Sequence, residues 1–178
     1  MVLDGFIQHL RNSPGARVLE LGTRRVKGMP PSHRKAWAPD CAWVRADYQE
    51  GLDVDVVADA HDLLATFPAA SFDAVVACSV FEHIQRPWLA ASSIGKVLKP
   101  GGYVFVQTHQ SYPLHAHPFD YWRFSTEGLR TLFEDADLAV EGAYYDFPCR
   151  ILSFWPIGHL RIGFGKAYLN SNIIARRV

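Results

Sequence analysis

The stretch that decides the fold is Arg17-Val18-Leu19-Glu20-Leu21-Gly22-Thr23-Arg24, an apolar run that ends in an acid and is followed by a glycine. Short apolar runs without polar alternation are typical of strands buried on both faces of a parallel sheet. Gly22 has no β-carbon, so the backbone there can approach a ligand closely. Alone, a glycine after a strand is equally consistent with an ordinary turn, and both interpretations stay open.

Four further runs of the same kind follow this one along the chain: Ala42–Ala46, Val54–Ala58, Phe72–Cys78 and Tyr103–Thr108. Between the last two runs, Pro87 opens a helical segment that Lys99-Pro100-Gly101-Gly102 closes. Proline is favoured at the start of a helix and glycine just past its end. This pattern predicts a strand, helix, strand crossover of the kind that joins parallel strands.

Elements at the two ends of the chain complete the predicted domain. A leading helix within residues 1–14 is expected to cover the sheet, and Ser125 is expected to cap a later helix by accepting from the amide of Gly128 or its neighbour. The stretches Val140–Tyr145 and Arg150–Phe154 predict late strands separated by a turn at Pro148. We expect one α/β domain over residues 1–178, a doubly wound, mostly parallel sheet with helices on both faces.

Composition and charge narrow the possible partners. The chain has 178 residues, 49% of them hydrophobic, and its 18 Lys and Arg balance its 18 Asp and Glu. No net field therefore attracts nucleic acid or an anionic membrane surface, and we expect a small-molecule substrate. No apolar stretch approaches the ~20 residues of a membrane span. The 3 cysteines show no disulfide or metal spacing, which favours a reducing, cytoplasmic location.

Acids follow three of the predicted strands. Glu20 ends the first, Asp47 ends the second and Asp59 follows the third. The carboxyl ends of parallel strands meet at one edge of a sheet, where ligands bind. We expect Asp47 to accept both hydroxyl hydrogens of a ribose and Asp59 to accept from an adenine amino group. The alternative for Asp47 is a solvated turn acid.

A fourth stretch, Ser71-Phe72-Asp73-Ala74-Val75-Val76-Ala77-Cys78-Ser79-Val80-Phe81-Glu82-His83, is followed by Leu98-Lys99-Pro100-Gly101-Gly102-Tyr103. In order and spacing, the segments from Arg17 to Phe133 resemble the compact branch of the class I S-adenosylmethionine-dependent methyltransferases. The resemblance implies a Rossmann-like methyltransferase sheet and S-adenosylmethionine as the methyl donor. It places Glu20 and Gly22 beside the methionine part of the cofactor.

The resemblance also implies roles for the other positions of these motifs. Asp47 would hold the ribose and Tyr48 would lie near the adenine, while Glu82 would stand at the mouth of the site. The remaining residues predicted to contact the cofactor are Asp59, Ala60 and His61 around the adenine ring, Cys78, Ser79 and Val80 at the methionyl and methyl end, His83 beside Glu82 at the mouth, and Thr23 in the first loop.

The first loop departs from the family pattern. Family members commonly carry several glycines after the first strand, whereas here the next glycine after Gly22 is Gly28. The segment that follows leaves room for little more than a short helix after Ser32. We predict that Arg24 compensates by forming a bidentate clamp on the methionine carboxylate. The alternative is that Arg24 belongs to a solvated basic face.

Residues 109–124 form the richest polar and aromatic stretch of the chain and are predicted to be the acceptor-site loop. A histidine that titrates near neutrality is a natural base for a hydroxyl acceptor. We predict His109 or His117 as this base, oriented by Asp120. The pocket around it is expected to use His115, Tyr121, Trp122 and Arg123. Each of these residues has packing of the loop as its alternative, and the histidine spacing matches no recognisable zinc site, so no metal is expected.

The sequence thus predicts an enzyme that methylates a small-molecule acceptor, favouring a hydroxyl of a sugar or secondary metabolite. One alternative is a methyltransferase-like protein that binds cofactor or partner without catalysis. Another is a nicotinamide-dependent oxidoreductase, which lacks support because no GxGxxG turn follows the first strand. Residues 146–178 are expected to add a late strand and then a lid or interface, in a monomer or homodimer.

Overall fold

The structure is a computed structural model that describes residues 1–28, 30–151 and 165–178. Its centre is a seven-stranded sheet with the order β3-β2-β1-β4-β5-β7-β6. The strands are β1 (Arg17–Leu21), β2 (Ala42–Asp47), β3 (Val56–Val57), β4 (Phe72–Cys78), β5 (Leu98–His109), β6 (Leu138–Ile151) and β7 (Gly165–Arg177). Neighbours from β3 through β5 pair in parallel, whereas β7 pairs antiparallel with both β5 and β6.

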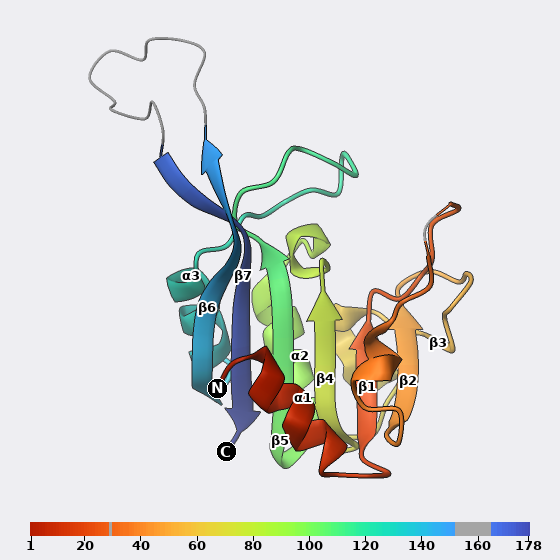
Figure 1. Ribbon diagram of the computed structural model, residues 1–178. Coiled ribbons are helices and arrows are strands. Elements are labelled where there is room, and N and C mark those ends of the chain that lie inside the picture. The colour runs from red at the N-terminus through yellow and green to blue at the C-terminus, as the bar shows by residue number, and fades with distance from the viewer. Residues whose placement is uncertain (29, 152–164) are drawn as a thin grey trace.

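Helices cover both faces of the sheet, as Figure 1 shows. One face carries α1 (Leu3–Arg11) and the 3-10 turn η1 (Arg34–Trp37), and the other carries α2 (Pro87–Val97) and α3 (Thr126–Glu134). Two further 3-10 turns, η2 (Ala60–Ala65) and η3 (Phe81–His83), follow β3 and β4. The predicted doubly wound, mostly parallel sheet is therefore confirmed.

Each face of the sheet has its own apolar core, because successive residues of a strand point to opposite faces. On the α1 face, Phe6 and Val18 are fully buried, and the ring of Phe6 stacks on Phe105 of β5 at 5.7 Å. On the other face, Leu19 belongs to the larger core with Phe133 of α3. The near-continuous apolar runs seen in the sequence are thus explained by burial on both sides.

The predicted capping of α3 is confirmed and the predicted strands agree in part. The Oγ of Ser125 accepts a hydrogen bond from Gly128 N at 3.0 Å. The bounds of β1 and β4 match the prediction, whereas β3 has only two residues. The residue before β3, Asp55, accepts from the Arg45 backbone and guanidinium instead of extending the strand. Between β1 and β2 the described residues form no α-helix, only η1, as the short segment had indicated.

The predicted turn at Pro148 is wrong. Strand β6 runs through this residue, and Pro148 lies opposite Tyr168 of β7. Proline has no N–H to give to a ladder, but β6 is the edge strand of the sheet, where that loss is tolerated. The end of the second predicted strand, residues 152–154, lies outside the described residues.

The structure of residues 165–178 corrects a second expectation, that the end of the chain forms a lid or interface. The residues from 165 onward, predicted as part of a lid or interface, form β7 inside the sheet. There Arg176 bonds Glu141 at 2.8 Å and Arg177 donates to the carbonyl oxygen of Lys96 at 3.2 Å. The part of the expected lid at 152–164 lies outside the described residues. Among the helices that are described, none is long and apolar enough to cross a bilayer.

The start of β5 offers a test of how tightly this sheet is packed. A β-carbon on Gly102 would lie 2.9 Å from Lys99 O and 3.0 Å from Asp73 O, both backbone atoms. We expect Gly102→Ala to lower the free energy of unfolding by about 2 kcal/mol, measured by urea denaturation. Gly165→Ala is the matched control, because no atom of the described residues lies within 4 Å of its added carbon. Equal effects of the two substitutions would contradict this packing.

Candidate active site

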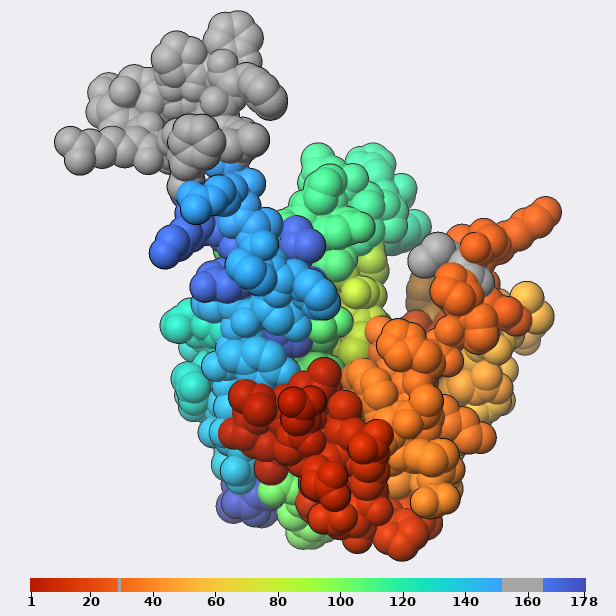
Figure 2. All heavy atoms as spheres, in the orientation of Figure 1, coloured from red at the N-terminus to blue at the C-terminus, as the bar shows by residue number. Residues whose placement is uncertain are grey.

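The three strand-end acids lie along one edge of the sheet. The register pairs Glu20 with Arg45 in β2 and Asp47 with Val57 in β3, so Glu20, Asp47 and Asp59 follow one another across the carboxyl ends of parallel strands. Figure 2 shows a notch at this edge, between the segment after β1 and the segment after β5. The acids therefore have the arrangement that the sequence predicted, beside a hollow in the surface.

Asp47 is held by backbone donors. Its carboxylate accepts from Arg24 N and from Gln49 N, each at 3.1 Å, and only 8% of the residue is exposed. The Nε of Arg24 lies 3.9 Å from Asp47 Oδ1. The side chain of Arg24 thus lies at the acid predicted to hold the ribose, a position that does not favour the predicted clamp on the methionine carboxylate. Neighbouring Thr23 is buried and Tyr48 is 60% exposed.

Asp59 and His61 form a local cap. Asp59 Oδ1 accepts from His61 N at 2.9 Å and lies 2.6 Å from His61 Nδ1, which fixes the start of η2 at Ala60. Burial would raise the pKa of Asp59, but the backbone and ring of His61 outweigh it and the pKa is lowered. The Asp59 side chain is 65% exposed. It is thus an ionised acid that also remains open to a ligand.

The ends of β1 and β4 meet at very close range. Gly22 has φ +73°, and a β-carbon there would overlap Val80 Cγ2. Only glycine fits this place, because the loop after β4 crosses directly over it. Ser79 also has a positive φ of 55°. Burial raises the pKa of Cys78, so its thiol stays protonated. The predicted group Cys78, Ser79 and Val80 therefore lies beside the glycine of the first loop.

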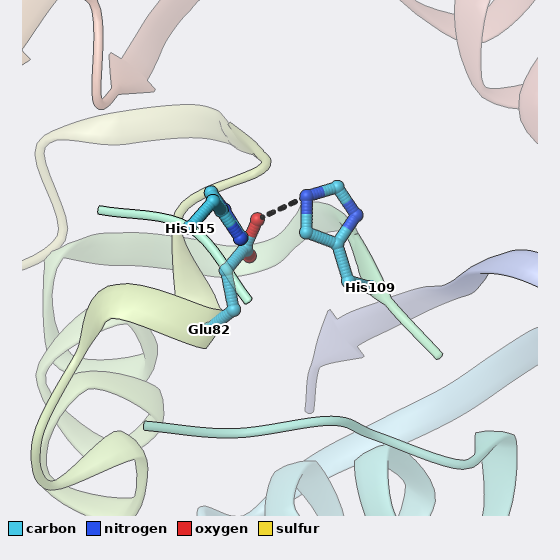
Figure 3. Close-up of side chains that lie close together, drawn as sticks. All are labelled: Glu82, His109 and His115. Atoms are coloured by element: carbon cyan, nitrogen blue, oxygen red, sulfur yellow. Dashed lines mark ion pairs between the residues drawn. The ribbon is translucent and has the colours of Figure 1, made fainter. Parts of the chain in front are cut away.

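Beyond β4, a buried carboxylate pairs with a histidine of β5. Glu82 has no exposed surface, and its Oε1 lies 3.0 Å from His109 Nε2 (Figure 3). Thr108 Oγ1 donates to Glu82 Oε2 at 2.7 Å. Burial would lower the pKa of His109, but the hydrogen bond and charge of Glu82 outweigh it and the pKa is raised. Burial would raise the pKa of Glu82, yet His109 and Thr108 lower it.

This pairing corrects the predicted partner of His109. Asp120 is not its neighbour; it bonds the guanidinium of Arg123 at 2.6 and 2.8 Å. Both ring nitrogens of His109 are occupied, since Nδ1 lies 3.2 Å from Asn170 Oδ1, and Tyr112 stacks on the ring at 4.2 Å. His109 therefore lacks a free nitrogen for a substrate proton.

His115 is the histidine that lies against Asp120. Its Nδ1 is 3.3 Å from Asp120 Oδ2 and 3.1 Å from Pro113 O. Figure 3 shows the ring directed toward Glu82 and His109. The hydrogen bonds from Arg123 lower the pKa of Asp120 far below its usual range. Asp120 is thus a permanently charged partner for His115, although the sequence had assigned it to His109 or His117.

Other predicted loop residues hold the loop in place. The Nδ1 of His83 lies 2.7 Å from Phe119 O, and the backbone amides of Tyr121 and Trp122 donate to Glu82 O. The guanidinium of Arg123 also donates to three carbonyl oxygens of the loop. Arg123 and His83 therefore act in loop structure. His117 is exposed and joins none of the described clusters.

The sequence prediction missed the partners of three residues at this edge. The sequence placed Glu82 only at the mouth of the site and gave it no partner. Its position four residues beyond the end of β4 was a usable signal that this acid lies at the same edge as the others. Ser32 and Arg34 had no signal, because the segment after β1 matches no motif; both contact Glu20.

The cluster of Glu82, His109 and His115 also has the donor atoms of a metal site. Glu82, His109 and His115 each offer one ligand atom, and these atoms lie within 4.8 Å of one another. Imidazole and carboxylate are suitable ligands for several divalent metals. The expected absence of a metal therefore stays a prediction that chelation can test.

The buried ion pair predicts a pH-dependent contribution to stability. Because the pKa of His109 is raised in the folded state, its stabilisation of the fold is complete below the unfolded pKa and is lost as pH rises through the folded pKa. Because the pKa of Glu82 is lowered, its stabilisation is complete above the unfolded pKa and is lost as pH falls through the folded pKa. Both contributions are present between the ordinary values 4.5 and 6.5. We expect His109→Gln to lower Tm by about 6 °C near pH 5.5 and by clearly less near pH 9. His117→Gln is the exposed control, and a pH-independent loss would rule out the ion pair.

Comparison with known proteins identifies the family. A family model described as a methyltransferase domain matches residues 3–149. The ubiquinone biosynthesis O-methyltransferase of Burkholderia vietnamiensis is 27% identical over 117 residues, which are 58% of this chain and 49% of that protein. Its counterpart from Nitrosococcus oceani is 35% identical over 65 residues, 36% of this chain and 28% of that protein. The matches thus span about half, or less, of these relatives' length.

Solved structures share the fold at low sequence identity. A SAM-dependent methyltransferase from Archaeoglobus fulgidus has a TM-score of 0.67 at 16% identity and covers 98% of this chain and 93% of its own. The 1,6-didemethyltoxoflavin-N1-methyltransferase of Burkholderia thailandensis, solved with S-adenosylhomocysteine, has a TM-score of 0.67 at 16% identity over 98% of this chain and 76% of its own. Because the family model spans most of the chain, this protein belongs to the methyltransferase domain family.

Proposed function

We propose that the chain transfers the methyl group of S-adenosylmethionine to a hydroxyl oxygen of a small-molecule acceptor, with His115 as general base. The observation that carries this proposal is the placement of His115. Its Nδ1 faces Pro113 O and Asp120, whereas Nε2 has no hydrogen-bond partner among the described residues. A neutral imidazole that donates through Nδ1 presents a lone pair at Nε2, which is what a base requires.

The residues at the edge fit the cofactor. A carboxylate has about four lone-pair sites, and two of those on Asp47 accept backbone N–H groups, which leaves capacity for a ribose diol. Asp59 is charged and 65% exposed, which suits an adenine amino group. The close packing of Gly22 against Val80 brings backbone to the place between β1 and β4, the usual binding point of a doubly wound sheet.

When bound, the cofactor supplies a methyl group activated by a positive sulfur. The acceptor hydroxyl would give its proton to His115 Nε2 as its oxygen forms a bond to the methyl carbon and the carbon–sulfur bond breaks. The imidazolium formed would be stabilised by Asp120, 3.3 Å from Nδ1, and by the buried Glu82 beside it. The loop of residues 109–124 would align the acceptor and exclude water.

The surroundings of His115 support a ring-bearing acceptor with a hydroxyl. The ring of Tyr112 lies 5.2 Å from that of His115 and the residue is 45% exposed, so aromatic surface is available to a flat ring or to a sugar. The sequence matches to ubiquinone biosynthesis O-methyltransferases favour an oxygen acceptor. We also propose a reducing compartment such as the cytoplasm, because Cys41, Cys78 and Cys149 are all free.

Replacement of the base should affect turnover more than binding. We expect His115→Asn to lower kcat by roughly 100-fold, within the usual range for a general base, while leaving the KM for S-adenosylmethionine little changed. Release of S-adenosylhomocysteine is measured with phenols, glycosides and amines as acceptors. His117→Asn is the matched loop control and should keep wild-type turnover. Methylation of amines alone would contradict the oxygen acceptor, and absence of any turnover would favour a cofactor-binding protein without catalysis.

Removal of metal should leave the reaction unchanged. If His115 acts as a base, dialysis against EDTA is expected to preserve kcat, because no step requires a Lewis acid. Loss of activity that zinc or manganese restores would instead assign Glu82, His109 and His115 as metal ligands. Calorimetry on the same sample should show binding of S-adenosylmethionine and none of NAD, since a GxGxxG turn is lacking.

A further inference from the structure

One face of the sheet changes from apolar to polar along β5 and β7. Phe105 of β5 lies opposite Ile174 of β7, and both are fully buried in the core that they share with Phe6 of α1. Because side chains two residues apart on a strand share a face, the next positions on this face are Gln107 and Asn172, which again lie opposite each other. The apolar core therefore ends between the first pair and the second.

The cover that α1 gives to this face ends at the same level. Leu3, the first residue of α1, donates its N–H to the hydroxyl of Tyr144 at 3.1 Å, and Tyr144 of β6 lies opposite Asn172. Figure 1 shows α1 across the lower half of this face, below the loops that leave the carboxyl ends of β4 and β5. The polar pair thus lies past the helix, toward the edge that carries the candidate active site.

The next row of the same face connects this pair to the proposed base. His109 of β5 lies opposite Asn170 of β7, and Asn170 lies opposite Asp146 of β6. The ring of His109 is 5.2 Å from that of His115. We refer to Gln107, Asn172 and Asp146 as the polar strip. It begins beside the histidines of the active site and extends toward the edge strand β6.

The polar strip has acceptor oxygens that lack donors. Gln107 Nε2 donates to Asp146 Oδ2 at 3.3 Å, across β7, whereas Asp146 Oδ1 is buried with no hydrogen-bond partner among the described residues. Asn172 is 0% exposed, and its Nδ2 donates to Tyr144 O at 3.3 Å. The Oδ1 of Asn172 is likewise without a partner in the described part of the chain. A ligand that donates hydrogen bonds would satisfy both oxygens, which are costly to leave unpaired.

The chemistry of the polar strip favours hydroxyl groups as its ligands. The carboxylate of Asp146 only accepts, whereas the amides of Gln107 and Asn172 both donate and accept. A hydroxyl also does both, whereas an ammonium group only donates. Adjacent strands lie about 4.8 Å apart, so the strip extends over roughly 10 Å from β5 to β6, enough for more than one hydroxyl. Several hydroxyls on one ring therefore match it better than an amine or a flat ring with a single hydroxyl.

We propose that Gln107, Asn172 and Asp146 form a polyol subsite that selects a sugar as the acceptor, binding hydroxyls that neighbour the one to be methylated. The inference rests on the proposed function, in which His115 takes the proton of the reacting hydroxyl. Tyr112 stacks on His109 and is 45% exposed, so its ring offers the sugar an apolar surface beside the strip. Asp146 thus serves acceptor specificity and takes no part in proton transfer.

The test compares acceptors. Release of S-adenosylhomocysteine is measured with the methyl glycosides of glucose, galactose, mannose and rhamnose, and with 4-nitrophenol, which has a single hydroxyl on a flat ring. We expect Asp146→Asn to raise the KM for the best glycoside by about 10-fold, the difference between a charged and a neutral acceptor, with kcat and the KM for S-adenosylmethionine within about 2-fold. Glu141→Gln is the matched control, because this acid of the same strand bonds Arg176 instead and should keep the wild-type KM.

A second variant separates specificity from folding. Asn172→Leu removes the unpartnered oxygen at similar volume, so we expect the glycoside KM to rise by about 10-fold while Tm stays equal or increases. This variant also decides the proposal if Asp146→Asn fails to fold. A lower Tm together with an equal loss of activity toward every acceptor would show a merely structural role for the strip and overturn the subsite.

The remaining outcomes distinguish this inference from the proposed function. Methylation of 4-nitrophenol but of no glycoside would overturn the polyol subsite and leave transfer to a hydroxyl in place. A glycoside KM that Asp146→Asn does not change would also overturn the subsite. If the wild-type chain methylates no hydroxyl compound, the proposed function fails first and the subsite fails with it.

Discussion

The arrangement of the active-site edge depends on one carboxylate that has no contact with solvent. Glu82 is 0% exposed, and a charge so buried is tolerated only with close partners. Thr108 and His109 supply them from the end of β5. The backbone carbonyl of Glu82 also accepts hydrogen bonds from the amides of Tyr121 and Trp122, near the end of the acceptor-site loop. A single residue after β4 thus fixes the end of the next strand and both ends of the loop that carries His115.

The fold was predictable where burial alone decides the structure. The strands Arg17–Leu21 and Phe72–Cys78 are apolar except at Arg17, Glu20 and Asp73 because they lie in the middle of the sheet, so their bounds were readable from the sequence. Strand β7 was hidden, because Asn170, Ser171 and Asn172 interrupt its apolar pattern, and they form hydrogen bonds with His109, Phe124 O and Tyr144 O. The turn expected at Pro148 failed for another reason: proline stops a central strand but not an edge strand.

The residue types of the site were predictable, but their pairing was not. Acids at strand ends follow from the parallel sheet, and a histidine-rich loop after β5 is visible in the sequence. Which acid meets which histidine depends on how the loop folds back. Arg123 lies three residues from Asp120 and binds it, so Asp120 pairs locally and Glu82, twenty-seven residues before His109, becomes the partner of that histidine. No sequence pattern encodes such a contact.

The edge divides into two halves with different electrostatics. Toward β2 and β3, the acids Asp47 and Asp59 are held by backbone N–H groups, which fix a carboxylate without cancelling its charge. Toward β5, the acids Glu82 and Asp120 face imidazole rings, so a proton can be exchanged there. Binding of a nucleoside and transfer of a proton are therefore assigned to separate groups.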